Sequence, residues 1–147
     1  MNRQRNIRRE LHLLPLFLQL FGICAASMLV PAVYGLVIRD HDGSRAFFYA
    51  ALLGLILFTM LAVVLNGRRV PQSALGPLLA LFSAFVFLPV YFAIPFVEAL
   101  PTTRFINAYF EMVSALTTTG AKLFQDPGRL SDTLHLWRAQ VGWMGGL

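Results

Sequence analysis

Charged side chains and cysteines are both scarce in this chain of 147 residues. Only 13% of the residues are charged, whereas 57% are hydrophobic and the mean hydropathy is +0.66. The single cysteine, Cys24, lies in an apolar run, so we expect a buried, unreactive thiol. These shortages exclude a disulfide scaffold, and the composition is typical of an integral membrane protein.

The sequence also lacks the residue patterns that enzymes, metal sites and nucleic-acid-binding proteins need. No nucleophile–base pair, phosphate-binding loop or metal-ligand spacing occurs, so we predict neither enzymatic activity nor a cofactor. The three histidines, His12, His41 and His135, are far apart and do not suggest one metal site. The net charge is +5, but the basic residues form no stripe with interleaved aromatics, which argues against nucleic-acid binding.

Long uncharged runs are, by contrast, abundant. Residues 13–38 contain no charge, and this run exceeds the about 20 residues that a helix needs to cross a bilayer. Residues 46–65 form a second uncharged run. Residues 74–99 form a third apolar run, which contains three prolines and one charged residue, Glu98, near its end. The chain turns apolar again from about Leu130. We therefore predict an all-α polytopic membrane protein that is embedded in the lipid bilayer.

The N-terminus also has two features of a signal peptide. Four arginines precede the first apolar run, and the sequence "CAAS" at residues 24–27 offers small residues for cleavage. The run continues well past a cut after Ala26, however, and Ile23 stands where a lipoprotein-type site needs a small residue. We therefore expect an uncleaved first span.

Basic residues flank the apolar runs unevenly. The N-terminal tail holds four arginines and the linker at residues 66–73 holds two, whereas the first linker offsets its arginines with Asp40 and Asp42. Because basic residues concentrate in cytoplasmic loops, we expect the N-terminus and the second linker in the cytoplasm. The segment that follows Pro101 then starts at the outer face of the membrane.

That segment is too long for a tight connection between two helices. Apolar residues recur with helical spacing from Thr103 to about Leu116, which predicts an amphipathic helix with Thr102 or Thr103 as its N-cap. Such a helix is about 20 Å long and reaches only part-way across a membrane. It leads directly into the small polar stretch "TTTGA" at residues 117–121.

Two interpretations of this stretch are open. In one, the helix lies flat at the membrane interface and Gly120 is the left-handed residue that ends it. In the other, the helix enters the membrane and "TTTGA" returns as extended backbone along an aqueous path, where irregular backbone is tolerated. The helix C-terminus would then direct partial negative charge at a cation. Rings of carbonyls that replace a hydration shell are a known means of selecting potassium.

The order of these segments resembles the Trk/Ktr/HKT superfamily of potassium transporters, and in particular the Trk-type membrane subunit. The similarity rests on "NAYFEMVSALTTTGAKLF" at residues 107–124, followed by "LWRAQVGWMGGL" at residues 136–147. The pair of helices before this unit also agrees with the Trk type. The resemblance implies potassium uptake through a backbone-carbonyl filter in the inner membrane of a bacterium.

The resemblance further implies which residues form that filter. Its strand is expected at residues 117–121, with the carbonyls of Thr118 and Thr119 as the main K⁺ ligands and Gly120 as the characteristic glycine. A homodimer and a cytoplasmic nucleotide-binding regulatory subunit are implied as partners. The threonines and the glycine are compatible with Na⁺ as well as K⁺. The predicted ion-binding residues are Thr117, Thr118, Thr119, Gly120 and Ala121.

Members of this family carry four membrane-pore-membrane repeats around one pore, whereas this chain contains one. Because a ring of carbonyls needs about four contributors, we expect the N-terminal part of a longer transporter, with the other three repeats as partners. Residues 1–73 would form the N-terminal tail and hairpin, and residues 74–147 a first repeat cut short in its second helix. The alternatives are a homotetramer of this chain and a non-conducting membrane scaffold with an interfacial helix.

Two charged residues near the predicted filter are possible supports for it. Glu111 lies in the short helix, where it either shapes the field at the filter or only fixes the helix. Arg138 lies in the last apolar segment and needs a partner, for which Asp132, Glu111 and free carbonyls are candidates. A turn is predicted at residues 126–128. Close helix packing is predicted at Gly142, Gly145 and Gly146.

Overall fold

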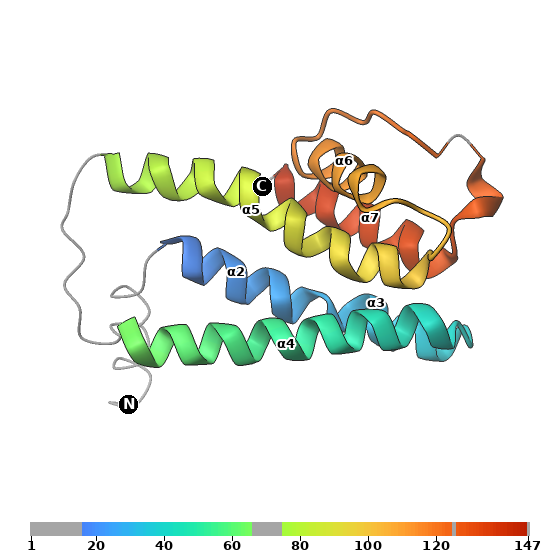
Figure 1. Cartoon of the computed structure of the whole chain (residues 1–147), viewed down its shortest axis with the longest axis horizontal. Coiled ribbons are helices and arrows are strands. Elements are labelled where there is room, and N and C mark those ends of the chain that lie inside the picture. The colour runs from blue at the N-terminus through green and yellow to red at the C-terminus, as the bar shows by residue number, and fades with distance from the viewer. Residues whose placement is uncertain (1–15, 66–74, 125, 147) are drawn as a thin grey trace.

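The computed structural model describes residues 16–65, 75–124 and 126–146, and within these ranges it contains helices and no strands. The N-terminal arginines, His12 and the linker at residues 66–74 lie outside the described residues. Figure 1 shows long helices lying side by side, with shorter ones packed against one end of the bundle. The helices are α2 (Leu16–Ser27), α3 (Leu29–Val37), α4 (His41–Leu65), α5 (Leu75–Ala99), α6 (Phe105–Leu116) and α7 (Asp132–Gly145).

Three stretches are long and apolar enough to cross a membrane: Leu16–Val37, His41–Leu65 and Leu75–Ala99. They match the three predicted spans closely, so the predicted all-α polytopic membrane fold is confirmed. Much of the surface of α4 is apolar, including Leu53, Met60 and Val63, each at least half exposed. Apolar side chains that are exposed along a membrane-length helix are suited to contact with lipid.

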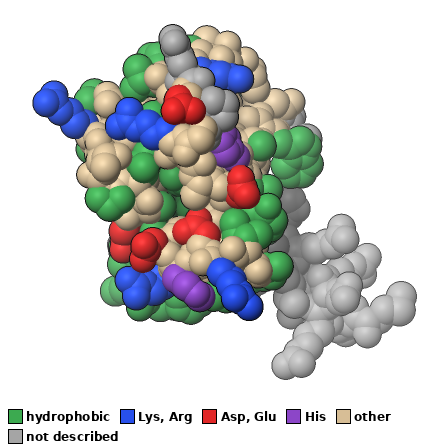
Figure 2. Space-filling model, turned by 90° about the vertical axis from the view of Figure 1, so that its right-hand side faces the viewer, with side chains coloured by type: hydrophobic (Ala, Val, Ile, Leu, Met, Phe, Trp, Pro, Cys, Tyr) green, Lys and Arg blue, Asp and Glu red, His purple; other side chains and the backbone are tan. Residues whose placement is uncertain are grey.

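Charged side chains gather at one end of the bundle. Figure 2 views the molecule from the end that carries the α3–α4 turn and the start of α7, and it shows acidic, basic and histidine side chains on that face. Charged groups are costly in hydrocarbon, so this end is suited to an aqueous interface.

The first span is broken at Met28, between α2 and α3. Pro31 has no N–H, so the carbonyl of Ser27 has no helical donor four residues later. The side chain of Gln140 in α7 supplies one, because its Nε2 donates to the Ser27 carbonyl at 2.8 Å. The break in the first span is therefore satisfied by the last helix, and the N-terminal hairpin is joined to α7 by a specific contact.

Replacing Gln140 with methionine should therefore destabilise the protein. The substitution keeps the volume of the side chain but leaves the Ser27 carbonyl without its donor, at a cost of about 1–2 kcal/mol. Thermal unfolding in detergent measures the loss. Thr59→Val is the matched control, because the Thr59 hydroxyl is exposed and donates to the carbonyl of Leu55 within its own helix. Equal melting temperatures for the two variants would contradict this role of Gln140.

The turn between the first two spans is tighter than the sequence suggests. The second span was expected to start near Ala46, yet α4 begins at His41, so most of the predicted polar linker is helical. Asp40 caps α4, since its Oδ1 accepts from the N–H of Gly43 at 3.0 Å. Arg39 has a φ of 62°, a left-handed conformation that lets the chain reverse here. Capping by Asp40 explains why charged residues can begin this helix.

Asp40 also lies near polar groups at the start of α7. Burial acts to raise the pKa of Asp40, but the nearby Thr133 hydroxyl, the N–H of Gly43 and the Ser131 hydroxyl favour the charged form. Their combined effect lowers the pKa below its ordinary value of 3.8. The ionised carboxylate is thus the form that the fold stabilises.

The pH dependence of the free energy of unfolding should report the charge of Asp40. A group with a lowered pKa contributes stability above its unfolded value, and loses it as the pH falls through the folded value. Asp40→Asn should therefore be less stable than the parent near neutral pH, and the difference should disappear as the pH falls below about 3.8. Chemical unfolding of both proteins at a series of pH values measures it. A difference that stays constant down to pH 3 would show that the charge of Asp40 is not involved.

Aromatic side chains form the centre of the bundle. Trp137 of α7 is fully buried, with ring centroids 5.4 Å from Phe47 of α4 and 5.2 Å from Phe92 of α5. Trp143, one to two turns later, is exposed. Cys24 is buried and unpaired, as predicted. The core thus joins α7 to the two long spans and fixes the helix that lies behind the candidate site.

Candidate functional site

The short helix α6 packs against α5 and α7 at one end of the bundle (Figure 1). Its observed bounds, Phe105–Leu116, lie within the predicted helix, but the predicted N-cap is wrong. The N-cap is Arg104, which makes no side-chain capping bond. Thr103 lies one residue earlier, in the turn that precedes the helix, where its N–H donates to the Leu100 carbonyl. With 12 residues, α6 is about 18 Å long and part-way in length, as predicted.

The end of α6 has an unusual conformation. Thr118 has a φ of 55°, a left-handed conformation that is rare for a β-branched residue. Its N–H donates to the Ala115 carbonyl at 3.0 Å, and the N–H of Thr119 donates to the Ser114 carbonyl at 3.0 Å. This is the bonding pattern of a Schellman motif, in which glycine normally holds the left-handed position. The residue that ends the helix is therefore Thr118, two positions before Gly120.

The backbone of the "TTTGA" stretch is not a regular extended strand. Gly120 has a φ of 73°, so two left-handed residues flank Thr119, whose φ is not positive. The sign of φ therefore reverses at each step from Thr118 to Gly120, which does not happen in an extended strand.

The hydroxyls of Thr117 and Thr119 are occupied by the protein. Thr117 donates its hydroxyl proton to the Val113 carbonyl at 2.8 Å, and its oxygen lies 2.8 Å from the hydroxyl of Thr119. Because a hydroxyl has one proton, Thr119 is the donor in the second contact. In the described part of the chain, no hydrogen bond reaches the carbonyls of residues 117–120, and all four residues are exposed. The main-chain oxygens of residues 117–120 are thus available to a ligand.

The chain after Gly120 is held against α6 by two polar side chains. Ser114 donates its hydroxyl to the carbonyl of Ala121 at 2.8 Å. One oxygen of Glu111, Oε1, accepts from the N–H groups of Leu123 at 2.6 Å and Phe124 at 3.2 Å. Ala121 differs in this respect from the other four predicted ion-binding residues, since its carbonyl is engaged by α6.

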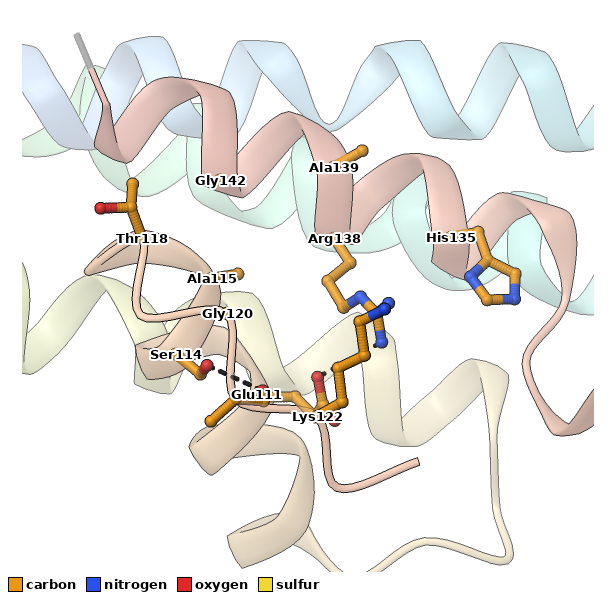
Figure 3. Close-up of a pocket in the computed structure, with 11 residues that line it drawn as sticks. Glu111, Ser114, Ala115, Thr118, Gly120, Lys122, His135, Arg138, Ala139 and Gly142 are labelled. Atoms are coloured by element: carbon orange, nitrogen blue, oxygen red, sulfur yellow. Dashed lines mark hydrogen bonds and ion pairs between the residues drawn. The ribbon is translucent and has the colours of Figure 1, made fainter. Parts of the chain in front are cut away.

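Glu111 and Arg138, the two predicted supporting residues, are brought together. Arg138 Nη1 lies 3.5 Å from Glu111 Oε2, and the Glu111 side chain is only 1% exposed. Of the partners proposed for Arg138, the structure thus selects Glu111. Figure 3 shows both side chains beside a cavity of about 320 Å³ between α6, the stretch that follows it and α7. Other residues that line the cavity include Thr118, Lys122 and His135.

Of the three glycines predicted to allow close helix packing, Gly145 brings α7 close to the end of α6, whereas Gly142 and Gly146 have only ordinary contacts. A Cβ atom added to Gly145 would overlap the Leu116 carbonyl oxygen and lie 2.6 Å from its carbon. At Gly142 the nearest atom to such a Cβ is the Ala115 carbonyl oxygen, at an ordinary 3.7 Å. The closest approach of α7 therefore lies immediately before the "TTTGA" stretch.

The predicted turn at residues 126–128 is also present. Residues Pro127–Arg129 form a short 3₁₀ turn, in which the N–H of Gly128 donates to Asp126 Oδ1 at 3.0 Å. Ser131 then caps α7, because its hydroxyl accepts from the N–H of Leu134. The sequence interpretation missed Ser114, although its spacing of three residues from Glu111 places both polar side chains on one face of the predicted helix.

Comparison with known proteins gives relatives that cover most of the chain. It is 29% identical over 143 residues to the Trk system potassium uptake protein TrkI of Halomonas elongata. The aligned region covers 96% of this chain and 28% of TrkI. The chain is 30% identical over 129 residues to the Trk system potassium uptake protein TrkH of Salmonella typhimurium, and this alignment covers 84% of the chain and 26% of TrkH. An uncharacterized cation transporter of Methanocaldococcus jannaschii is 26% identical over 146 residues, and this alignment covers 98% of the chain and 29% of the transporter.

These similarities confirm the predicted resemblance to Trk-type proteins and extend it beyond the two quoted blocks. The chain spans between a quarter and a third of the length of the curated relatives that it matches. No family model matches the chain. No solved structure matches it either.

Proposed function

We propose that this chain, a relative of the Trk potassium uptake proteins over most of its length, contributes one membrane-pore-membrane unit to a potassium-uptake pore. The observation that carries the proposal is the backbone of residues 117–120. It follows a helix of part-membrane length, its carbonyls accept no hydrogen bond within the described residues, and left-handed residues alternate along it. Carbonyls that are exposed and accept no hydrogen bond from the protein are suited to replace the hydration shell of a cation.

The electrostatics of α6 favour the same ligand. The C-terminus of a helix carries a partial negative charge of about half an elementary charge. Here that end leads directly into Thr117, so it adds to the field of the carbonyls that follow. In this proposal the ligands are the main-chain oxygens of Thr118 and Thr119, with Thr117 and Gly120 beside them. The occupied hydroxyls of Thr117 and Thr119 support a main-chain rather than a side-chain site.

One such unit does not enclose an ion, since a ring needs about four contributors. The chain covers 26–29% of its curated relatives, a proportion that fits one unit of four together with the helices that precede it. We therefore propose that three further units complete the pore, and that residues 1–73 and 74–147 are the hairpin and the first unit. A homodimer and a cytoplasmic nucleotide-binding subunit are the proposed partners.

The proposed location is the cytoplasmic membrane of a bacterium, with the N-terminus inside. The three membrane-length helices support a multi-pass protein. The charged end in Figure 2 then faces outward, and the candidate filter is entered from that side. The basic residues of the tail and of residues 66–73 support this orientation.

Ion uptake by the native gene product tests this function. Expressed in a bacterial strain that lacks its own potassium uptake systems, it should restore growth at low K⁺ and accumulate Rb⁺, a K⁺ analogue. An excess of Na⁺ should compete weakly. Stable insertion into the membrane without ion uptake would instead support the alternative, a non-conducting scaffold. Equal competition by Na⁺ and K⁺ would support an unselective cation pathway.

A further inference from the structure

We infer that Glu111 and Ser114 are positioning residues that end the ion-binding backbone at Gly120. They fasten the chain that follows, residues 121–124, to α6, and Arg138 holds the Glu111 carboxylate in place. The inference rests on the proposed function and narrows it: the carbonyl of Ala121, predicted above as an ion ligand, belongs to the supporting structure.

The contacts form an ordered set along one face of α6 (Figure 3). Ser114 supplies a donor to the carbonyl of Ala121, and Glu111 supplies an acceptor to two successive N–H groups, those of Leu123 and Phe124. The two side chains are three residues apart in α6. The donor, Ser114, lies opposite a backbone carbonyl, and the acceptor, Glu111, lies opposite two backbone N–H groups. A shift of this backbone by one residue would break all three bonds, so the contacts fix its register.

Both oxygens of the Glu111 carboxylate are engaged by protein groups. The carboxylate is buried, its Oε1 is shared by two N–H groups, and its Oε2 lies against Arg138. Its charge is therefore compensated locally. This arrangement favours a role in holding backbone over the alternative interpretation, in which the carboxylate shapes the field at the filter.

The direction of the Ala121 carbonyl follows from its hydrogen bond. A carbonyl that accepts from Ser114 at 2.8 Å is directed at α6 and is engaged there. Gly120 is the last residue before this change, and its left-handed φ of 73° makes the change of direction possible. The ion-facing carbonyls are then those of residues 117–120.

Substitutions of Glu111 separate the two roles. Glutamine keeps a carbonyl oxygen that can accept from Leu123 and Phe124 but removes the charge, whereas leucine removes both. For the native gene product, we expect Glu111→Gln to keep the preference for Rb⁺ over Na⁺ within about threefold of the parent. Glu111→Leu should reduce the preference for Rb⁺ over Na⁺ by about tenfold or more, because the N–H groups of Leu123 and Phe124 lose their acceptor, and the bond of Phe124 is buried. A merely electrostatic role predicts equal losses in both variants.

Arg138 provides the second arm of the experiment. Arg138→Gln should reduce the preference for Rb⁺ over Na⁺, because it leaves the buried Glu111 carboxylate without its counter-charge. Adding Glu111→Gln should restore most of it, since the neutral side chain needs no cation. Ser114→Ala, a mild truncation, should lower the preference several-fold by releasing the Ala121 carbonyl. The amount of each variant in the membrane and its melting temperature in detergent are measured in parallel, with Thr59→Val as the reference substitution.

The outcomes are distinguishable from a failure of the proposed function. The positioning role would be overturned if Glu111→Gln and Glu111→Leu lost the ion preference equally. It would also be overturned if adding Glu111→Gln did not restore the ion preference of Arg138→Gln. Parent-like ion preference in both Glu111→Leu and Ser114→Ala would overturn it too. In each case a strong effect of Gly120→Ser would leave the filter assignment standing. If Gly120→Ser is also without effect, the filter assignment itself is wrong.

Discussion

Replacing Gly120 with serine should reduce the preference for K⁺ over Na⁺ by about tenfold or more, or abolish uptake altogether. Gly120 has a φ of 73°, and any residue with a Cβ is disfavoured there by about 1–2 kcal/mol. An added Cβ would meet no atom within 4 Å, so the substitution strains the backbone without a packing clash. Because the proposed ligands are backbone oxygens, a small rotation of this peptide changes the ion site directly.

Gly128→Ser is the matched control. Gly128 lies in the turn before α7, its φ is not left-handed, and an added Cβ would make only ordinary contact with Asp126. This variant should transport as the parent does. Uptake of Rb⁺ in competition with Na⁺ measures both proteins in the same cells. If Gly120→Ser kept the parent flux and selectivity, residues 117–120 would not be the filter.

The membrane architecture was predictable because its signal is local. A run of uncharged residues reports a span regardless of what surrounds it, and the starts of α2 and α5 were located within a few residues. The start of α4 was not, since charged residues were interpreted as a linker. Asp40 caps the helix and makes a charged first turn possible, a signal that capping rules alone could have supplied.

Features that depend on distant contacts were not predictable from the sequence. Pro31 indicates that the Ser27 carbonyl is free, but nothing local indicates that Gln140 satisfies it. The left-handed conformation of Thr118 is a stronger case, because the sequence argues against it. Glycine at position 120 was the natural candidate to end α6, and threonine disfavours that conformation. Two backbone hydrogen bonds, from Thr118 to Ala115 and from Thr119 to Ser114, accompany the conformation that threonine disfavours.

In the candidate site, too, the local features were predictable and the distant contacts were not. Residue types and order identified the "TTTGA" stretch, and the family resemblance assigned its role, which remains a prediction. Sequence reasoning left two roles open for Glu111 and three partners for Arg138, and only the folded contacts distinguish the partners. Ser114 was overlooked because a single serine in an apolar helix is a weak signal. Its partner, the Ala121 carbonyl, is a backbone group that no sequence pattern marks.

The contact between α7 and the end of α6 gives the second large effect. Gly145→Ala should destabilise the protein by about 1–3 kcal/mol, because the new methyl group would overlap the backbone of Leu116, which cannot rotate aside as a side chain can. The helices must separate, and the start of residues 117–120 moves with Leu116. We therefore expect this variant to lose ion preference as well as thermal stability in detergent.

Gly142→Ala tests whether the close approach or the glycine itself is responsible. The two glycines lie one turn apart in α7, but at Gly142 the added methyl group would rest 3.7 Å from the nearest atom. Alanine also favours a helix over glycine by about 1 kcal/mol, so this variant should be as stable as the parent or more so. Equal destabilisation by the two substitutions would contradict the close approach. Opposite effects would indicate that α7 supports the filter from behind, through a backbone contact that only glycine at position 145 permits.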